Sequence, residues 1–323
     1  MKINLKLFAE VPVTMTHADI SVNPTGLRRI LRFLQKPWKV QKKSLQGRYL
    51  RWIPHAILPI RLPNRSWWFA ENDFIGVALI FGGFENIEYA LAQRIVRPGM
   101  TVLDIGAHKG LYSLLFSKTV GPEGRVLSFE PSLRERSRLN LHLKINSCRN
   151  VKVFDFALGQ TDGKAQLFVV EGTETGLNSL RPPNEPVHTH QETVQVRALD
   201  AVLAEQQVSR VDFIKVDVEG AELAVFSGSV ELLKRLPRPM ILAEVSDLRT
   251  KQWGHTGNDL LSFLEAHHYT WFAISPEGKL GFVDRQKSFY NDNFLAVPEE
   301  KLWEVRAQFV NEDLEAVDRR HQA

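Results

Sequence analysis

The sequence predicts an α/β fold, in which a mostly parallel sheet carries helices on both faces and follows a basic N-terminal extension. From about residue 101 to residue 267, short apolar runs alternate with helix-length segments, as in parallel strands joined by crossover helices. Two later apolar runs, 270–275 and 294–298, are separated only by turn residues. We therefore expect these two runs to pair antiparallel, as a hairpin at one edge of the sheet.

The individual elements follow this pattern along the chain. Prolines in residues 50–70 indicate a short hairpin, and apolar spacing over 85–95 predicts a helix that Pro98-Gly99 ends. We expect strands at 101–106, 125–130, 151–158, 165–170, 211–218 and 240–245, and helices at 109–119, 132–146, 220–235 and 257–267. Apolar residues between Leu27 and Leu34 predict a short helix near the N-terminus, and a charged amphipathic tail follows residue 299.

Length and composition favour one large folded domain with an appendage. The chain has 323 residues, of which 44% are hydrophobic and 24% charged, which excludes wholesale disorder. We place the extension at 1–65 and the main domain at 66–323. The single cysteine, Cys148, excludes an intramolecular disulfide and a cysteine-based zinc site. The uncharged run 74–84 is too short for a bilayer, which needs about 20 residues, and we expect a cytoplasmic protein.

The first 70 residues are strongly basic. They contain thirteen Lys and Arg against two acidic residues, a formal charge of +11, which leaves −7 for the remainder. Four tryptophans lie in this segment: Trp38, Trp52, Trp67 and Trp68. Two interpretations stay open: contact with phosphates, an acidic substrate or an anionic membrane surface, or a solvated extension that packs a few aromatic rings on the main domain. Peripheral membrane contact through 1–65 is therefore one of the alternatives.

The segment after the first strand of the alternating region has the character of a cofactor loop. Asp104 is followed by Gly106, which permits a tight turn, by the small Ala107, and by Gly110, which opens a helix with an electropositive N-terminus. The next strand ends at Glu130, where a carboxylate can accept hydrogen bonds from both hydroxyls of a ribose. In open α/β sheets ligands bind beyond such strand ends.

The loop favours S-adenosylmethionine over a nicotinamide dinucleotide. A dinucleotide loop has the pattern G-x-G-x-x-G around a pyrophosphate, whereas this loop reads G-A-H-K-G. Asp104 would repel a pyrophosphate but would attract the ammonium group of a methionine moiety.

At this point several blocks of the chain resemble the FkbM-type S-adenosylmethionine-dependent methyltransferases. The family pattern V-L-D-I-G-A-N-x-G-x-Y is matched by Val102 to Tyr112, and the most specific block, D-F-I-K-V-D-V-E-G-A-E, by Asp212 to Glu222. Further matches are F-E-P at 129–131, A-L-G-x-x-x-G at 157–163, N-S-L at 178–180, L-D at 199–200 and N-F-L-A-V-P at 293–298. The resemblance covers about residues 70–298 and departs from the family at His108, where the family has Asn.

The resemblance implies a Rossmann-like class I methyltransferase that moves a methyl group from S-adenosylmethionine to a hydroxyl of a sugar, glycolipid or polyketide-like natural product. The cofactor contacts that we expect are Asp104, Gly106, Ala107, His108, Gly110, Tyr112, Glu130 and Pro131. Glu85 recurs in the family pattern and is expected to close over the methionine end. Asp155 and Phe156 are either adenine contacts or ordinary strand residues.

Removal of the acceptor's proton points to carboxylates at the strand ends. A hydroxyl must lose its proton before or during attack, so we take Asp217 as the first candidate base and Glu219 as the second. Glu244, from the next strand, is expected to bind the substrate and lies within reach as a carboxylate. His108 is either a proton acceptor or a structural substitution. Asp217, Glu219 and Glu244 could also hold Mg²⁺, but the resemblance demands no metal and none is expected.

Two further features of the sequence, a polar segment and a pair of oppositely charged residues, lead to predictions. The polar segment 171–192 has the length of a substrate lid, with Asn178, Ser179, His188 and His190 as hydroxyl-binding candidates; the alternative for these histidines is a solvated loop. Lys215 and Glu222 are expected to form an ion pair that braces the strand–helix turn. The partner that we expect is a small-molecule or glycan acceptor, and the sequence leaves a homo-oligomer open.

Three rival functions remain. A nucleic-acid methyltransferase would explain the basic front, but the Asp/Asn-Pro-Pro-aromatic motif of amino-methylating enzymes is absent: Asp217-Val218-Glu219-Gly220 occupies that position. No nucleic acid is therefore expected. A nicotinamide oxidoreductase lacks its glycine pattern. A non-catalytic cofactor-binding scaffold is disfavoured by the intact Asp104, Glu130 and Asp217.

Overall fold

The computed structural model describes residues 34–53, 55–309, 315 and 317–319. The chain divides into two compact units, Met1–Gln46 and Gly47–Ala323. The short helix that we expected between Leu27 and Leu34 falls almost entirely on residues outside the described part. This division lies within helix α2 (Trp38–Trp52), and the boundary between an extension and a methyltransferase domain after residue 65 stays a prediction. Residue 65 lies inside a hairpin, because β1 (Leu58–Arg61) pairs antiparallel with β2 (Trp67–Ala70).

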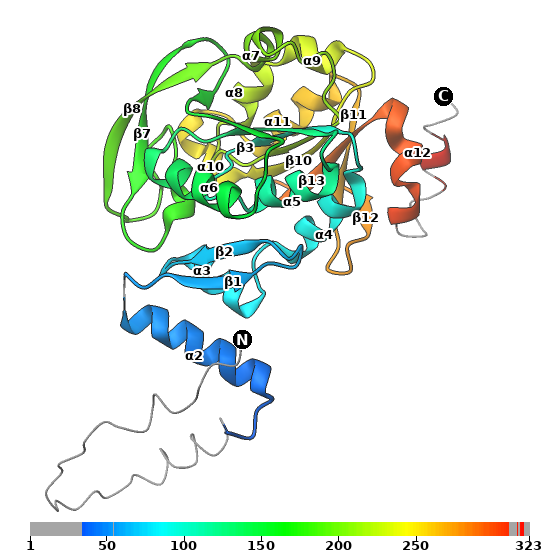
Figure 1. Ribbon diagram of the computed structural model, residues 1–323. Helices are drawn as coiled ribbons and strands as arrows, with labels where there is room; N and C mark the ends of the chain where they lie inside the picture. The colour runs from blue at the N-terminus through cyan, green and yellow to red at the C-terminus, as the bar shows by residue number, and fades with distance from the viewer. Residues whose placement is uncertain (1–33, 54, 310–314, 316, 320–323) are drawn as a thin grey trace, which may run out of the picture. The chain divides into compact units, whose positions relative to one another are not determined.

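An eight-stranded sheet forms the centre of the second unit, in the order β12-β11-β13-β10-β9-β3-β4-β5. Its strands are β3 (Thr101–Ile105), β4 (Arg125–Phe129), β5 (Val151–Phe154), β9 (Phe213–Val216), β10 (Met240–Ser246), β11 (Tyr269–Ile274), β12 (Leu280–Phe282) and β13 (Asn291–Pro298). The run from β10 to β5 is parallel throughout (Figure 1). The predicted α/β fold with a mostly parallel sheet is therefore confirmed.

The C-terminal hairpin differs in detail from the prediction. Strands β11 and β13 pair antiparallel as expected, but β13 also pairs antiparallel with β10 and so lies inside the sheet. The edge strand is β12, which pairs with β11 and arises from the segment that we had taken as turn residues only.

Helices cover both faces of the sheet (Figure 1). One face carries α4 (Asn86–Ile95), α5 (Leu111–Val120) and α6 (Leu133–Ile145), and the other carries α7 (Leu199–Glu205), α8 (Glu222–Ser227), α9 (Val230–Lys234) and α11 (Gly257–Glu265). The single helix expected over 220–235 is interrupted between α8 and α9. At the interruption, a Cβ added to Gly228 would lie 2.1 Å from the Gly159 carbonyl oxygen.

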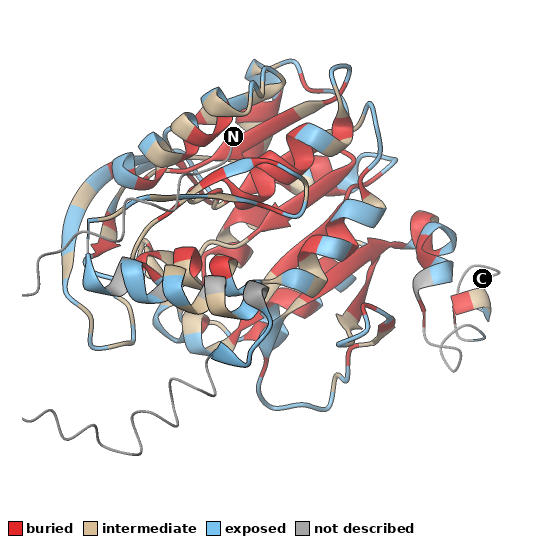
Figure 2. Cartoon of the chain, turned by 60° about the horizontal axis from the view of Figure 1, so that its bottom comes forward, coloured by how far each residue is buried: buried red, intermediate tan, exposed pale blue. Residues whose placement is uncertain are grey.

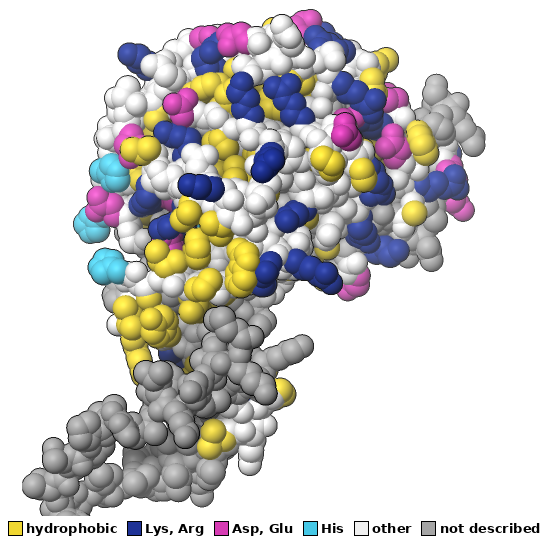
Figure 3. Space-filling view, in the orientation of Figure 1, with side chains coloured by type: hydrophobic (Ala, Val, Ile, Leu, Met, Phe, Trp, Pro, Cys, Tyr) yellow, Lys and Arg dark blue, Asp and Glu magenta, His cyan; other side chains and the backbone are white. Residues whose placement is uncertain are grey.

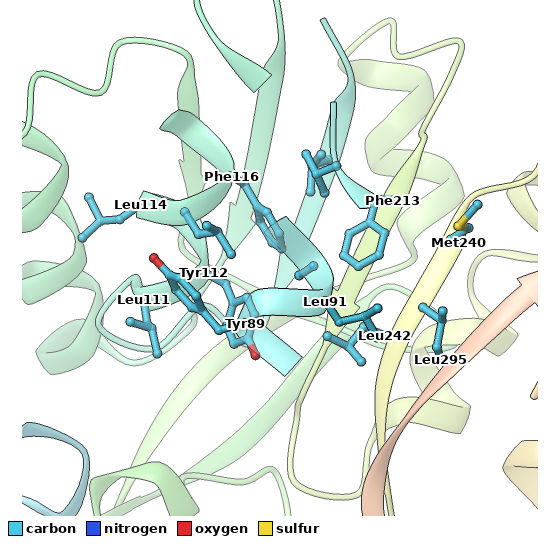
Figure 4. Close-up of a cluster of buried hydrophobic side chains, with 14 of the residues drawn as sticks. Tyr89, Leu91, Leu111, Tyr112, Leu114, Phe116, Phe213, Met240, Leu242 and Leu295 are labelled. Atoms are coloured by element: carbon cyan, nitrogen blue, oxygen red, sulfur yellow. The ribbon is translucent and has the colours of Figure 1, made fainter. Parts of the chain in front are cut away.

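The strands alternate between the two layers of core, as buried strands of a two-faced sheet must. On the α5 side, Phe213, Met240, Leu242 and Leu295 form one continuous apolar cluster, with Tyr112 of α5 beside it (Figure 4). Figure 2 shows the strands buried between helices whose outer faces are exposed. The polar side chains at the strand ends lie next to this apolar layer.

A second, three-stranded sheet has the order β6-β8-β7, from β6 (Ala157–Leu158), β7 (Gly163–Val170) and β8 (Thr189–Arg197). The strand expected over 151–158 is therefore split: it leaves the large sheet after Phe154 and pairs Ala157 with Val196 of β8. The polar segment 171–192 is also not wholly a loop, because its last residues begin β8.

Helix α3 (Phe74–Phe81) was not predicted. Asp73 caps its first turn by accepting from the Gly76 N–H at 2.6 Å, and Gly82 ends it in the left-handed conformation. Within the described residues, no one helix has the length and apolar character needed to cross a membrane. Only α3 taken together with α4, bent by 78°, satisfies both criteria.

The close approach of the Gly106 turn to Asp217 can be tested by substitution. Gly106 has φ +81°, and a Cβ there would lie 1.8 Å from the Asp217 carbonyl oxygen. We expect Gly106→Ala to lower the free energy of unfolding by about 3 kcal/mol or more, because backbone strain and steric overlap add. Gly99 is the matched control, since it has φ +82° with nothing near its Cβ position. Gly99→Ala should cost only about 1 kcal/mol. Equal losses in urea unfolding of the two variants would contradict the steric argument.

Candidate active site

The loop after β3 is held against the end of β4. Gly106 and Ala107 both donate their N–H groups to the Phe129 carbonyl oxygen, at 3.1 and 3.0 Å. Glu130 is fixed in the same corner: Oε2 accepts from the His108 N–H and Oε1 from the Ser132 N–H, both at 2.8 Å. Burial raises the pKa of Glu130 to about 8, although these two N–H groups oppose the shift. The loop and the carboxylate therefore form one preorganised unit.

Asp104 lies beneath this loop and is 2% exposed. Its Oδ2 accepts from the Ser113 hydroxyl of α5 at 2.5 Å, and that hydroxyl also contacts Ser128 Oγ at 2.9 Å. Burial raises the pKa of Asp104 to about 6. The carboxylate thus joins β3, β4 and α5, and it also lines the larger of the two cavities described below.

His108 fastens the cofactor loop to the segment that follows β7. Its Nε2 lies 3.1 Å from the Thr175 carbonyl oxygen and 3.7 Å from Oε2 of the buried Glu135. Burial lowers the pKa of His108, so the neutral ring is favoured and Nε2–H donates to Thr175. The structure therefore gives His108 a positioning role, and only Nδ1 is left to accept a proton.

Lys109 fastens the same loop to the segment between β2 and α3. Its ammonium group is 5% exposed and contacts Glu71 Oε2, at 2.7 Å, and Asp73 Oδ2. Arg138 of α6 adds a second cation to Glu71. Neighbouring carboxylates raise the pKa of Lys109 although burial opposes them. Sequence reasoning missed this ion cluster, because Glu71 and Asp73 are distant from Lys109 along the chain.

Three carboxylates meet at the ends of β9 and β10. One oxygen from each of Asp217, Glu219 and Glu244 lies within 4.8 Å of the others. Lys215 Nζ donates to Asp217 Oδ2 at 3.0 Å, and Arg249 Nε lies 2.7 Å from Glu219 Oε2. The structure thus brings together the three carboxylates that the sequence singled out, and adds two cations.

The predicted ion pair between Lys215 and Glu222 is wrong. Lys215 is bound to Asp217, and Glu222 instead accepts from the backbone N–H of Val218 at 2.9 Å. The reason is geometric: Lys215 shares the α5 face of the sheet with Phe213, and the Asp217 carboxylate is the one within hydrogen-bond distance of its ammonium group. Burial alone would lower the pKa of Lys215, but Asp217 and the neighbouring glutamates raise it.

Burial dominates the electrostatics of the remaining carboxyl groups. It raises the pKa of Glu219 well above the usual range, with repulsion from Glu244 and Asp217 adding to the effect. The pKa of Glu244 is raised in the same way, by burial and then by the charges of Asp217 and Glu222. Burial also raises the pKa of Glu85, although the charge of Lys215 opposes this shift. Clusters with such shifted pKa values are typical of functional sites.

Two cavities flank the Gly106 turn. The smaller, about 70 Å³, is lined by Glu130, Pro131, Ala157, Leu158 and Ser179, and also by Asp217 and Glu219. The larger, about 420 Å³, is bordered by the acidic cluster, Glu85, Tyr112 and Lys215. Its apolar wall comes from Trp68, Phe74, Ile75, Phe84 and Leu177. This wall was missed from sequence, although the uncharged run 74–84 was the available signal.

Some predicted site residues lie elsewhere. Asp155 is exposed, and Phe156 packs against Phe129 and Phe154, so that neither lines either cavity. His188 and His190 are exposed at the start of β8, where His190 contacts Glu171 and Glu192. Ser179 does line the site and donates its hydroxyl to the Glu219 carbonyl oxygen at 3.0 Å. A hollow of about 690 Å³ lies at the amino ends of β4 and β5, away from all of these residues.

A parallel α/β sheet with a glycine loop after its central strand β3, and an acid at the end of the neighbouring strand β4, defines the class I methyltransferase fold. Residues 104–270, just over half of the chain, match the methyltransferase FkbM domain. The chain therefore belongs to the FkbM methyltransferase family, and the resemblance seen in the sequence is confirmed.

Three relatives show how the family match extends. AmbE, the AMB antimetabolite synthetase of Pseudomonas aeruginosa, is 26% identical over 64% of this chain, which is only 11% of its own length. Methyltransferase 1 of Beauveria bassiana is 28% identical, covering 39% of this chain and 57% of that protein. The 2-O-methyltransferase NoeI of Sinorhizobium fredii is 26% identical, covering 62% and 82%. The chain thus spans a small part of the first relative and over half of the second.

The crystal structure of methyltransferase FkbM from Methylobacillus flagellatus aligns with a TM-score of 0.39 and 16% identity, covering 70% of this chain and 55% of that one.

The contribution of the ion cluster of Lys109, Glu71 and Asp73 to stability can be tested by substitution. Lys109→Met leaves Glu71 and Asp73 without their buried cation, and we expect a loss of about 3–5 kcal/mol in the free energy of unfolding. The matched control is Lys234→Met, which removes an exposed partner of Glu231 and should change stability little. Urea unfolding measures both variants. A Lys109→Met protein as stable as the control would show that the cluster does not hold the loop.

Proposed function

We propose that the chain is an S-adenosylmethionine-dependent O-methyltransferase acting on a hydroxyl of a sugar, glycolipid or polyketide-like molecule. The observation that carries the proposal is the arrangement around Gly106. Glu130, a carboxylate suited to ribose hydroxyls, lines only the smaller cavity and Glu244 only the larger, whereas Asp217 and Glu219 line both. A methyl donor and its acceptor need two such adjoining sites.

The smaller cavity fits the chemistry of a nucleoside. Glu130 presents a fixed carboxylate, suited to two ribose hydroxyls, and Pro131, Ala157, Leu158 and Leu180 supply apolar contacts for a heteroaromatic ring. We propose that Ala157 and Leu158 replace Asp155 and Phe156 as adenine neighbours. Glu85, Asp104 and Tyr112, which border the larger cavity, would face the methionine portion. S-adenosylmethionine, when bound, supplies a methyl group already activated on a sulfonium.

The larger cavity supports an acceptor that is partly apolar. Phe74 is 58% exposed and also lines the cavity, and Phe84 meets its ring edge-on at 6.3 Å between centroids. Phe81 and Trp67 are also exposed, at 44% and 41%, and Figure 3 shows hydrophobic side chains gathered where β1, β2 and α3 lie. The apolar wall therefore continues from the cavity to the surface, and the carboxylates lie at its inner end. An acceptor that carries a hydroxyl next to an apolar group would place the hydroxyl at the carboxylates and the apolar group along this wall.

The similarity to NoeI, described as a 2-O-methyltransferase, supports oxygen as the atom methylated. The chain's own residues support the same choice, because removing a hydroxyl proton requires a base and three carboxylates line the acceptor cavity. Water exclusion would come from Leu177 and the segment that His108 fastens, which covers the loop.

The cofactor assignment is tested by calorimetry with S-adenosylmethionine and S-adenosylhomocysteine, with NAD as the control ligand. Ionised Glu130 accepts from both ribose hydroxyls, so affinity should rise with pH, by up to about tenfold per unit below its pKa, which is raised to about 8. Glu130→Gln should lose about 10- to 100-fold in affinity and most of this pH dependence. Binding of NAD alone, or equal affinity in the variant, would overturn the assignment.

The acceptor wall is tested with radiolabelled S-adenosylmethionine and pairs of acceptors: methyl glycosides and the corresponding long-chain alkyl glycosides. We expect transfer to favour the alkyl member of each pair. Phe74→Ser should raise KM for that member by about tenfold, through loss of apolar burial, and leave the methyl glycoside unaffected. Phe289→Ser is the control, because Phe289 is 52% exposed and lines neither cavity. No preference within the pairs would remove the apolar wall from acceptor recognition.

A further inference from the structure

The three carboxylates of the acidic cluster are not equivalent. Asp217 accepts from Lys215 Nζ at 3.0 Å, and Glu219 lies 2.7 Å from Arg249 Nε. Glu244 has no such cation: its Oε2 is buried and has no hydrogen-bond partner within the described part of the chain. Two of the three carboxylates are therefore occupied by a cation of the protein, and one has an oxygen free for a ligand.

The sheet register fixes where this free oxygen lies. Val216 of β9 pairs with Ala243 of β10, so that Asp217 and Glu244 are the next residues on the two strands. Met240 and Leu242 of β10 pack in the core on the α5 side, and Glu244 follows them at alternate positions on the same face. Glu244 thus stands directly above the apolar layer, at the inner end of the acceptor cavity that it lines.

The residue opposite Glu244 is also polar and carries no charge. Asn293 of β13 is paired with Glu244 in the antiparallel register, so that the two side chains share one face of the sheet. Asn293 Oδ1 is likewise buried without a hydrogen-bond partner. Two adjacent half-buried polar side chains, each with a buried oxygen that has no hydrogen-bond partner, indicate a place where a polar ligand completes the hydrogen bonding.

We propose that Glu244, and not Asp217, is the catalytic residue that accepts the proton of the acceptor hydroxyl. This inference rests on the proposed O-methyl transfer and assigns its base. Asp217 then serves as a positioning residue that holds Lys215 beneath the cluster, and Glu219 holds Arg249 at its rim.

The step balances with the groups already named. The O–H bond of the acceptor breaks and its proton passes to Oε2 of Glu244. The oxygen's electron pair forms the new bond to the methyl carbon, and the pair of the broken carbon–sulfur bond stays on sulfur, which becomes a neutral thioether. The proton leaves Glu244 for solvent after the product departs.

The charges around Glu244 suit this role. Asp217, Glu219 and Glu222 face it with their carboxyl groups, from the end of β9, the following turn and α8, while Lys215 of β9 and Arg249 of α10 (Asp247–Thr250) face it as cations. Asn293 opposes it from β13. Burial, followed by Asp217 and Glu222, raises the pKa of Glu244 well above that of a free carboxyl group. A base is most effective when its pKa lies near the working pH.

The role of Glu244 as the base fixes the sign of the pH dependence of kcat. Glu244 must be ionised to take the proton, so kcat should fall as pH decreases through its raised pKa. Asp217→Asn and Glu219→Gln should lower the rate through Lys215 and Arg249 but keep an acidic limb, because Glu244 remains. In Asp217→Asn this limb should move to lower pH, because the charge of Asp217 contributes to the raised pKa of Glu244.

The test measures methyl transfer from radiolabelled S-adenosylmethionine to the alkyl glycosides used above. Glu244→Gln should lower kcat by about 100- to 10,000-fold, the usual contribution of a general base, and abolish the acidic limb. Affinity for S-adenosylhomocysteine should stay unchanged, which also checks that the variant is folded. Glu244→Asp, a shorter carboxylate, should recover part of the rate. Retention of kcat and of the acidic limb in Glu244→Gln would overturn the assignment.

A second readout needs neither cofactor nor acceptor. The infrared carbonyl band of protonated carboxyl groups is followed from acidic to alkaline pH in the wild-type chain and in Glu244→Gln. The difference between them should contain one titrating carboxyl group. An empty difference spectrum would overturn the proposal. If the wild-type chain transfers no methyl group to any acceptor but the difference spectrum is as expected, the proposed function fails and not the titration of Glu244.

Discussion

The contact between the Gly106 turn and the end of β9 is the constraint on which the rest of the site depends. The space for a Cβ at Gly106 is taken by the Asp217 carbonyl oxygen, so two neighbouring parallel strands end in direct backbone contact. Gly106 and Asp217 line both cavities, and Glu130 lines only the smaller one, as Glu244 lines only the larger. Any residue larger than glycine would push the loop away from β9 and open one site into the other.

Charge is concentrated where the apolar core ends. The layer formed by Phe213, Met240, Leu242 and Leu295 (Figure 4) ends two residues before Glu244 on β10, and on β9 Lys215 follows Phe213 on the same face before Asp217. Lys215, 2% exposed, is the buried cation next to that layer, and the ring of Tyr112 lies 5.3 Å from its ammonium group. Because each anion at this boundary raises the cost of ionising the next one, protons are shared unequally among the carboxyl groups. That inequality is what distinguishes the roles proposed for Asp217 and Glu244.

The glycine loop and the carboxylate after β4 followed from local sequence, and the surroundings of the acidic cluster did not. Glycines with positive φ and an acid at a strand end are recognisable in a short window, so the turn at Gly106, the helix start at Gly110 and the strand end at Glu130 could be located from sequence. Asp155 and Phe156 were placed by continuing one strand too far, because the change of sheet after Phe154 depends on pairing with distant β8. His188 and His190 were singled out by residue type alone, and the fold leaves them at the surface.

The sequence by itself determined the family, the order of parallel strands and helices, and the carboxylates that end β4, β9 and β10, because these depend on periodicity and on motifs within single segments. Only the tertiary structure decided which cation each carboxylate meets, and that residues of α3 line the larger cavity. The same holds for the position of β12 at the sheet edge and of β13 between β11 and β10. Those features join residues far apart in the chain, and their energies arise from burial and from contacts across strands, which local patterns do not encode.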